Sequence, residues 1–211
     1  MVENLKTGTT TVCLVCKDGL VMAADKRATA GYMICGGKVE KVHKVTDSMA
    51  LTFAGSVSDL QLLLRVIRAQ VNLDQLRRNK EMKVKEAANM LATLVYNSIR
   101  RMSMVPAVTQ FLFGGKDSTG FYLFDIYPDG SITEYDDYVS SGSGSVFAYG
   151  VLEAKYKHNL TVAEGVKLAV EAINAAIKRD CASGNGVDVM TITKDGVNKV
   201  FSKQLDVNLM A

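Results

Sequence analysis

The apolar residues of this chain follow two different spacings, and the spacing changes several times between the two ends. Short runs rich in apolar and β-branched residues stop at turn residues, which is typical of β-strands. The gaps at 17–19, 128–130 and 194–196 contain Asp-Gly and predict tight antiparallel turns. We expect strands at residues 10–15, 20–24, 49–54, 109–113, 121–127, 131–135, 187–193 and 197–201.

Between these runs, apolar residues recur three and four positions apart, as they do on one face of an amphipathic helix. The apolar positions from 60 to 71 share such a face, and Ser58 is the expected N-cap of this helix. A second helix is expected over 84–95 and a third over 146–156. A fourth helix begins at the capping box formed by residues 161–164.

One more hairpin is expected in the segment before the third predicted strand. Its extended parts would be 32–34 and 39–45, with Gly36-Gly37 as the turn. The full order is then strands, two helices, strands, two helices and strands. Two sheets stacked face to face, with a helix pair on each outer side, bury every apolar face of these elements.

This order predicts an α+β fold, namely a four-layer αββα sandwich of two largely antiparallel sheets flanked by helix pairs. Adjacent strands joined by tight turns pair in antiparallel fashion, whereas parallel strands need long crossover connections. The length of 211 residues fits one large domain with a single core better than it fits two.

Composition excludes several classes of protein. The formal charge is only +3, and even the densest basic run, at 77–85, is typical of a solvated helix end, so we expect no nucleic-acid partner. No stretch approaches the ~18 consecutive apolar residues of a membrane span. The first eight residues lack the apolar core of a secretory signal, which favours the cytoplasm.

Cys13 and Cys16 would point to opposite faces of a strand, so they are not arranged to bind one metal ion together. We therefore expect buried, reduced, structural thiols and no metal site.

Motifs of familiar enzymes are missing or incomplete. The two histidines, His43 and His158, lie in a strand pattern and in a polar stretch. The Ser-Gly repeat at 141–145 does not have the G-x-S-x-G spacing of a nucleophile elbow, and Lys-Thr-Gly at 6–8 has no S-x-x-K companion. The chain has no phosphate-binding loop or dinucleotide-binding fingerprint, so we expect no cofactor.

One cluster of residues at the start of the first strand has a chemical interpretation. Gly8 is followed by Thr9, Thr10 and Thr11, and threonines favour strands for ordinary structural reasons. A threonine hydroxyl becomes a nucleophile only when a base takes its proton, and its own α-amine, with a pKa near 8, is partly neutral at pH 7. That amine is free only after the bond before Thr9 is cut, and Gly8 gives the backbone the freedom to bend there.

These residues belong to a set of blocks that resembles the proteasome β subunits. The blocks are GTTTV at 8–12, KDGLVMAADKRAT at 17–29, Lys41, AG at 54–55, GSGSVFAYGVLE at 142–153 and RDCASG at 179–184. They occur in the family's order, and the likeness extends from about residue 8 to about residue 200. The archaeal type is the most similar, with a bacterial form as the alternative. The resemblance implies the N-terminal-nucleophile hydrolase fold and a threonine endopeptidase.

The resemblance also implies a role for particular residues. The implied catalytic set is Thr9, Asp25, Lys41, Gly55, Ser143, Asp180 and Ser183. Thr9 would be the nucleophile, Lys41 would favour its alkoxide, and Asp25 would orient Lys41. Gly55 would donate its N–H group to the oxyanion. The two serines and the second aspartate would surround the Thr9 amine. The cleavage site would be Gly8–Thr9, so that residues 1–8 are a propeptide removed by autocatalysis and 9–211 form the catalytic domain.

The residues implied to contact substrate are Ala28, Thr29, Val39, Phe53 and Val57. Thr29 and Gly55 would hold the substrate backbone as an added strand. The other positions would line the primary specificity pocket, where the absence of an acidic residue predicts cleavage after hydrophobic residues. Phe53 would make this pocket shallow.

The implied partners are proteasome α subunits and other β subunits in stacked heptameric rings, a regulatory unfolding ATPase that acts through the α ring, and unfolded polypeptide substrates. Two other functions remain open at this point. One is an N-terminal-nucleophile amidohydrolase that acts on small amides, and the other is a non-catalytic ring subunit. Retention of Thr9 and Lys41 favours the protease.

Overall fold

The computed structural model describes residues 8–103 and 107–205, which form two five-stranded antiparallel sheets, a small hairpin and four helices. The first sheet has the order β10-β1-β2-β11-β12 and the second β5-β6-β7-β8-β9. The strands of the first sheet are β10 (Tyr138–Ser141), β1 (Thr11–Cys16), β2 (Gly19–Asp25), β11 (Gly186–Thr193) and β12 (Gly196–Gln204). Those of the second are β5 (Val42–Lys44), β6 (Met49–Gly55), β7 (Thr109–Asp117), β8 (Gly120–Ile126) and β9 (Ile132–Tyr135).

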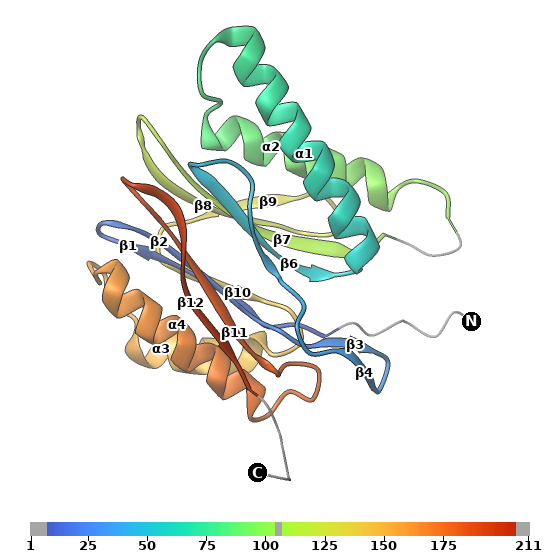
Figure 1. Cartoon of the computed structure of the whole chain (residues 1–211), viewed down its shortest axis with the longest axis vertical. Coiled ribbons are helices and arrows are strands. Elements are labelled where there is room, and N and C mark those ends of the chain that lie inside the picture. Colours follow the sequence, from blue (N-terminus) through green and yellow to red (C-terminus); the bar gives the residue numbers. More distant parts are fainter. Residues whose placement is uncertain (1–7, 104–106, 206–211) are drawn as a thin grey trace.

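The two sheets lie between two pairs of helices (Figure 1). Helices α1 (Val57–Arg78) and α2 (Val84–Ile99) cover the outer face of the second sheet, and α3 (Ser145–Lys155) and α4 (Val162–Ile177) cover the first. Three apolar clusters fill the three interfaces between these layers. The four-layer αββα sandwich predicted from the sequence is confirmed.

Strand β1 contributes side chains to two of the three apolar clusters. Val12, Leu14 and Cys16 face α3 and α4, whereas Cys13 faces the second sheet, as the alternation of side chains along a strand requires. The prediction that Cys13 and Cys16 lie on opposite faces is therefore correct. Both thiols are free and buried, and burial raises the pKa of each.

The predicted hairpin between residues 32 and 45 is wrong. Strand β4 (Met33–Gly36) instead pairs with β3 (Ala28–Ala30) through a turn at Gly31, whose φ of 60° lies in the left-handed region that glycine adopts easily. Strand β5 pairs with β6 across the short turn that follows it. Gly36 is the last residue of β4, and a side chain at Gly37 would meet the amide of Asn185, so this glycine provides close packing and not a turn.

Two smaller differences concern element ends. Helix α1 begins at Val57 with Ser56 as N-cap, two residues before the position expected from the apolar spacing. Strand β10 was not predicted, because two of its residues, Ser140 and Ser141, are polar. Both are nevertheless buried, and their hydroxyl groups bond to Thr11 on the neighbouring strand.

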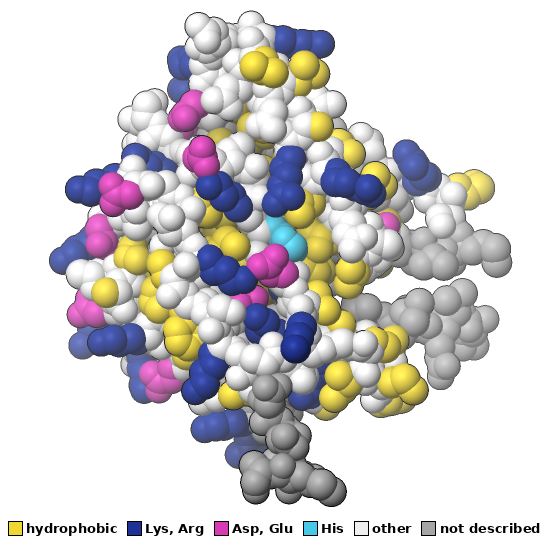
Figure 2. Space-filling view, viewed as in Figure 1, with side chains coloured by type: hydrophobic (Ala, Val, Ile, Leu, Met, Phe, Trp, Pro, Cys, Tyr) yellow, Lys and Arg dark blue, Asp and Glu magenta, His cyan; other side chains and the backbone are white. Residues whose placement is uncertain are grey.

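The surface carries charges of both signs. Figure 2 shows Lys and Arg side chains spread over one face among acidic side chains, without a continuous basic stripe. Among the helices of the described residues, none is long and apolar enough to cross a membrane.

Candidate active site

The peptide bond before Thr9 lies in a tightly packed, buried place. Thr9 is only 3% exposed. Its hydroxyl donates a hydrogen bond to the Gly8 carbonyl oxygen at 2.7 Å. The Gly8 N–H donates to the Thr29 hydroxyl at 3.1 Å. A Cβ at Gly8 would lie 1.7 Å from the Ala182 Cβ, so only glycine fits before the threonine. The nucleophile candidate is therefore held against the carbonyl group of the preceding residue.

A buried ion pair lies beside this bond. The Lys41 ammonium donates to Asp25 Oδ1 at 2.7 Å, and the Lys41 side chain is 3% exposed and that of Asp25 fully buried. The same ammonium lies 3.5 Å from the Gly8 carbonyl oxygen. Burial lowers the pKa of Lys41, while the charge of Asp25 opposes this change. The ammonium group of Lys41 therefore lies at the same carbonyl oxygen that accepts the hydrogen bond of the Thr9 hydroxyl.

Asp25 is fixed by backbone groups as well as by Lys41. It ends β2 and accepts hydrogen bonds from the N–H groups of Thr10 at 3.0 Å, Arg27 at 2.9 Å and Gly184 at 2.9 Å. Three backbone donors in addition to the Lys41 ammonium fix the orientation of this buried carboxylate. Asp25 thereby joins the segment that carries Thr9, the end of β2 and the loop before β11.

A second network surrounds the nitrogen of Thr9. Its N–H donates to the Ser143 hydroxyl at 3.3 Å, and Ser143 donates to Asp180 Oδ2 at 2.6 Å. Ser183 also donates to Asp180 Oδ2 at 2.6 Å, and the Thr10 and Ser183 hydroxyl oxygens lie 2.6 Å apart. Because Ser183 gives its proton to the carboxylate, Thr10 is the donor to Ser183. The structure thus brings Ser143, Asp180 and Ser183 together beside this nitrogen.

Two glycines before α3 let the chain pass close to the threonines. Gly142 has a φ of 92°, and a Cβ there would lie 2.1 Å from the Thr9 carbonyl oxygen. A Cβ at Gly144 would lie 2.0 Å from the Thr10 hydroxyl oxygen. The Gly-Ser repeat of the sequence is therefore a close-packed support of the site.

We expect Gly142→Ala to displace Thr9 and to leave residues 1–8 attached to the chain, because its Cβ overlaps the Thr9 carbonyl and its φ is strained. Intact mass spectrometry measures leader removal, and thermal unfolding measures stability. The matched control is Gly150→Ala within α3, where nothing lies within 4 Å of the new Cβ. This control should stabilise the helix by about 0.5–1 kcal/mol. Normal leader removal in Gly142→Ala would contradict this packing.

The predicted substrate contacts are only partly brought together. Ala28 and Val39 both flank Gly36, since a Cβ at Gly36 would lie 3.8 Å from Ala28 Cβ and 3.5 Å from Val39 Cγ2. Val57, the first residue of α1, is 40% exposed. Phe53 is a correction: it is 1% exposed and packs in the core beneath α1 and α2, so it presents no surface to a substrate.

Gly55 occupies a place where only glycine fits. It is the last residue of β6, has a φ of 129°, and a Cβ there would lie 2.3 Å from the Val108 carbonyl oxygen. Its half-buried backbone is the feature that the predicted oxyanion role requires, since a donor must approach its acceptor closely.

Sequence reasoning missed two residues of the site. Thr10 links the Asp25 and Asp180 networks through its N–H and hydroxyl groups. Arg27 donates from Nη1 to the Cys181 carbonyl oxygen at 2.8 Å and from Nε to Asn185 Oδ1 at 2.7 Å. Both lie in blocks that carried the family resemblance, but their partners are distant in the sequence and no local pattern indicates them.

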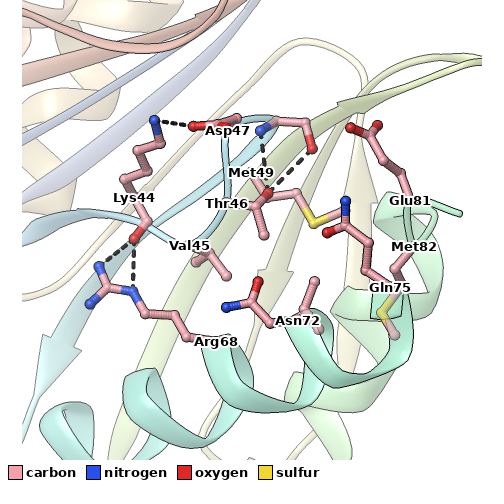
Figure 3. A pocket seen from close by; sticks show the side chains of 12 residues that line it. Lys44, Val45, Thr46, Asp47, Met49, Arg68, Asn72, Gln75, Glu81 and Met82 are labelled. Carbon is pink, nitrogen blue, oxygen red and sulfur yellow. Dashed lines mark hydrogen bonds and ion pairs between the residues drawn. The ribbon is translucent and has the colours of Figure 1, made fainter. Parts of the chain in front are cut away.

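A separate cavity of the surface lies away from the candidate active site. A cavity of about 390 Å³ lies between α1 and the β5–β6 turn, with Lys44, Asp47, Arg68, Asn72 and Gln75 among its lining residues (Figure 3). None of the predicted site residues lines it. Its side chains include no nucleophile paired with a base, so its chemistry differs from that around Thr9.

Comparison with known proteins identifies the family of this chain. A family model described as "Proteasome subunit" matches residues 5–192. Proteasome subunit beta of Ferroglobus placidus is 48% identical over 91% of this chain and 90% of its own length. Proteasome subunit beta 2 of Pyrococcus abyssi is 44% identical over 97% and 96%, and proteasome subunit beta of Methanocaldococcus vulcanius is 41% identical over 94% and 87%. The chain therefore belongs to the proteasome subunit family, as a β subunit.

Proposed function

We propose that this chain is a catalytic β subunit, a threonine endopeptidase that first cuts itself before Thr9. One observation carries the proposal. The Thr9 hydroxyl and the Lys41 ammonium both lie at the Gly8 carbonyl oxygen, at 2.7 Å and 3.5 Å. A nucleophile and a positive charge on one carbonyl group are the parts that acyl transfer needs.

Self-cleavage would be an acyl transfer within the chain. Thr9 Oγ1 attacks the Gly8 carbonyl carbon, and negative charge develops on the oxygen next to Lys41. The bond between that carbon and the Thr9 nitrogen breaks, the nitrogen takes a proton, and Gly8 becomes an ester of Thr9. Water then hydrolyses the ester, releases residues 1–8 with a carboxylate on Gly8, and regenerates the hydroxyl.

The freed α-amine then supplies the base for peptide hydrolysis. Its nitrogen takes the hydroxyl proton as Thr9 attacks a substrate carbonyl, and it returns this proton to the leaving amine. Ser143, Asp180 and Ser183 hold the nitrogen in place, and Asp25 keeps Lys41 beside the nucleophile. The Gly55 N–H is the proposed oxyanion donor. Water hydrolyses the acyl-enzyme and completes the cycle.

We expect this protease to prefer cleavage after hydrophobic residues. Ala28 and Val39 lie on either side of Gly36, and neither position carries a charge. A panel of fluorogenic peptides that differ only in the residue before the scissile bond measures the preference as kcat/KM. Leucine or tyrosine should exceed glutamate by about tenfold or more. A preference for glutamate would contradict the pocket.

The rest of the proposal follows from membership of the family. The chain would assemble with proteasome α subunits and further β subunits in stacked seven-membered rings and receive unfolded polypeptides from an ATPase at the α ring. Its place would be the cytoplasm. Purification of the assembled particle, with its stoichiometry from native mass spectrometry, tests this assembly independently of catalysis.

A further inference from the structure

A second row of ion pairs lies next to the Asp25–Lys41 pair. The Lys26 ammonium donates to Asp188 Oδ1 at 2.9 Å, and the Lys199 ammonium lies 3.4 Å from the same oxygen. Lys199 also donates to Glu40 Oε1 at 2.6 Å. The signs alternate along Lys26, Asp188, Lys199 and Glu40, which we call the outer ion row. Self-cleavage and peptide hydrolysis as described above use none of these groups.

The two end residues of the outer ion row are adjacent in sequence to Asp25 and Lys41. Lys26 follows Asp25, and Glu40 precedes Lys41. Neighbouring side chains on extended backbone point to opposite sides, so the two rows lie on either side of the same two segments. These segments are also joined directly, because the Val39 N–H donates to the Lys26 carbonyl oxygen at 3.1 Å.

The centre of the outer ion row is buried and its end is exposed. The exposed fraction of the side chain is 1% for Asp188, 12% for Lys26, 34% for Lys199 and 52% for Glu40. Glycine at position 186 leaves room for the Lys26 stem, since a Cβ there would lie 2.9 Å from the Lys26 Cδ. Buried charges that lose a partner are costly, so Asp188 is the member whose removal matters most.

Asp188 remains a carboxylate in this surrounding. Burial alone would raise its pKa, but the Ser202 hydroxyl and the ammonium groups of Lys26 and Lys199 hold the pKa below its ordinary value. The acid therefore bridges two cations that would otherwise repel one another.

We infer that Asp188, with Lys199, is a positioning residue for the proposed threonine protease: strands β11 and β12 hold the segments of Asp25 and Lys41 at their working separation through the outer ion row. This inference rests on the proposed function. It assigns the C-terminal hairpin an electrostatic task in catalysis, since the ammonium of Lys41 acts only if it stays beside the Thr9 hydroxyl.

The test compares matched variants in assembled particles. Asp188→Asn keeps the shape of the side chain but leaves two ammonium groups facing a neutral amide. We expect kcat for a fluorogenic peptide to fall about tenfold, with KM within about twofold, because the reacting groups shift while the substrate surface does not. The control is Asp47→Asn, the same chemical change in an ion pair whose acid is 94% exposed, and it should leave kcat unchanged.

Lys199 provides a second test that does not depend on a buried substitution. Lys199→Met should lower kcat about threefold, whereas Lys199→Arg keeps the charge and should restore kcat to within about twofold of the wild type. If Asp188→Asn particles do not assemble, this pair decides. Equal kcat in Lys199→Met, Lys199→Arg and the wild type would overturn the inference. If particles with Thr9→Ala hydrolysed the peptide at the wild-type rate, the proposed function itself would be overturned.

Discussion

Thr9→Ala is expected to leave residues 1–8 attached and to lower peptide hydrolysis by about 10⁴-fold or more, because it removes the proposed nucleophile. The substitution removes the hydroxyl that now donates to the Gly8 carbonyl oxygen, so the chain also loses the group that would attack its own backbone. Intact mass of the assembled particle reports the leader, and a fluorogenic peptide reports hydrolysis.

The control for this variant is Thr93→Ala. Thr93 lies on α2, is exposed, and its hydroxyl donates only to the Asn89 carbonyl oxygen among the bonds found for it. Both leader removal and hydrolysis should stay normal in this control. Wild-type rates of hydrolysis in Thr9→Ala particles would refute the assignment of the nucleophile.

Lys41→Met is expected to lower kcat by about 10³-fold, since it removes the positive charge beside the developing alkoxide and keeps the apolar stem. Leader removal should slow as well, because Lys41 also contacts the Gly8 carbonyl oxygen. Asp25 keeps its three backbone donors, so the fold should survive with a loss of about 3 kcal/mol. Single-turnover kinetics and thermal unfolding measure the two effects.

The pH profile separates the charge of Lys41 from its bulk. Burial lowers the pKa of Lys41 below the ordinary value of 10.5, so the ammonium loses its proton at a lower pH than a free lysine does. The rate should therefore fall on the alkaline side before pH 10.5 is reached. Lys41→Arg keeps its charge at these pH values, and its residual activity should lack this decline. The same decline in Lys41→Arg would show that another group causes it.

The layers of the fold followed from local patterns. The alternation in β1 and the spacing of apolar residues in α1 each indicate one buried face, and such faces pack in only a few ways. The hairpin after β2 was placed wrongly because Gly36-Gly37 matches a turn pattern, whereas the chain turns at Gly31 and Gly37 packs against Asn185. A contact between segments this far apart in the sequence leaves no local pattern.

Some contacts of the candidate site could likewise be expected from the sequence, and others could not. Thr9, Asp25 and Lys41 were expected together from the family blocks, and the structure places them in contact through Gly8 and one ion pair. The role of Thr10 as a link between two carboxylates depends on hydroxyl directions that a sequence does not contain. The pocket prediction failed at Phe53 because the phase of β6 turns this ring towards the helices.

Peptide hydrolysis by the proposed mechanism requires that the Thr9 nitrogen change from an amide into a free amine before any substrate is cut. The most direct measurement follows intact mass and peptide hydrolysis together while newly assembled particles mature. Activity should rise in proportion to the fraction of chains that begin at Thr9. Full activity in particles whose chains still carry residues 1–8 would contradict the role of the free Thr9 amine.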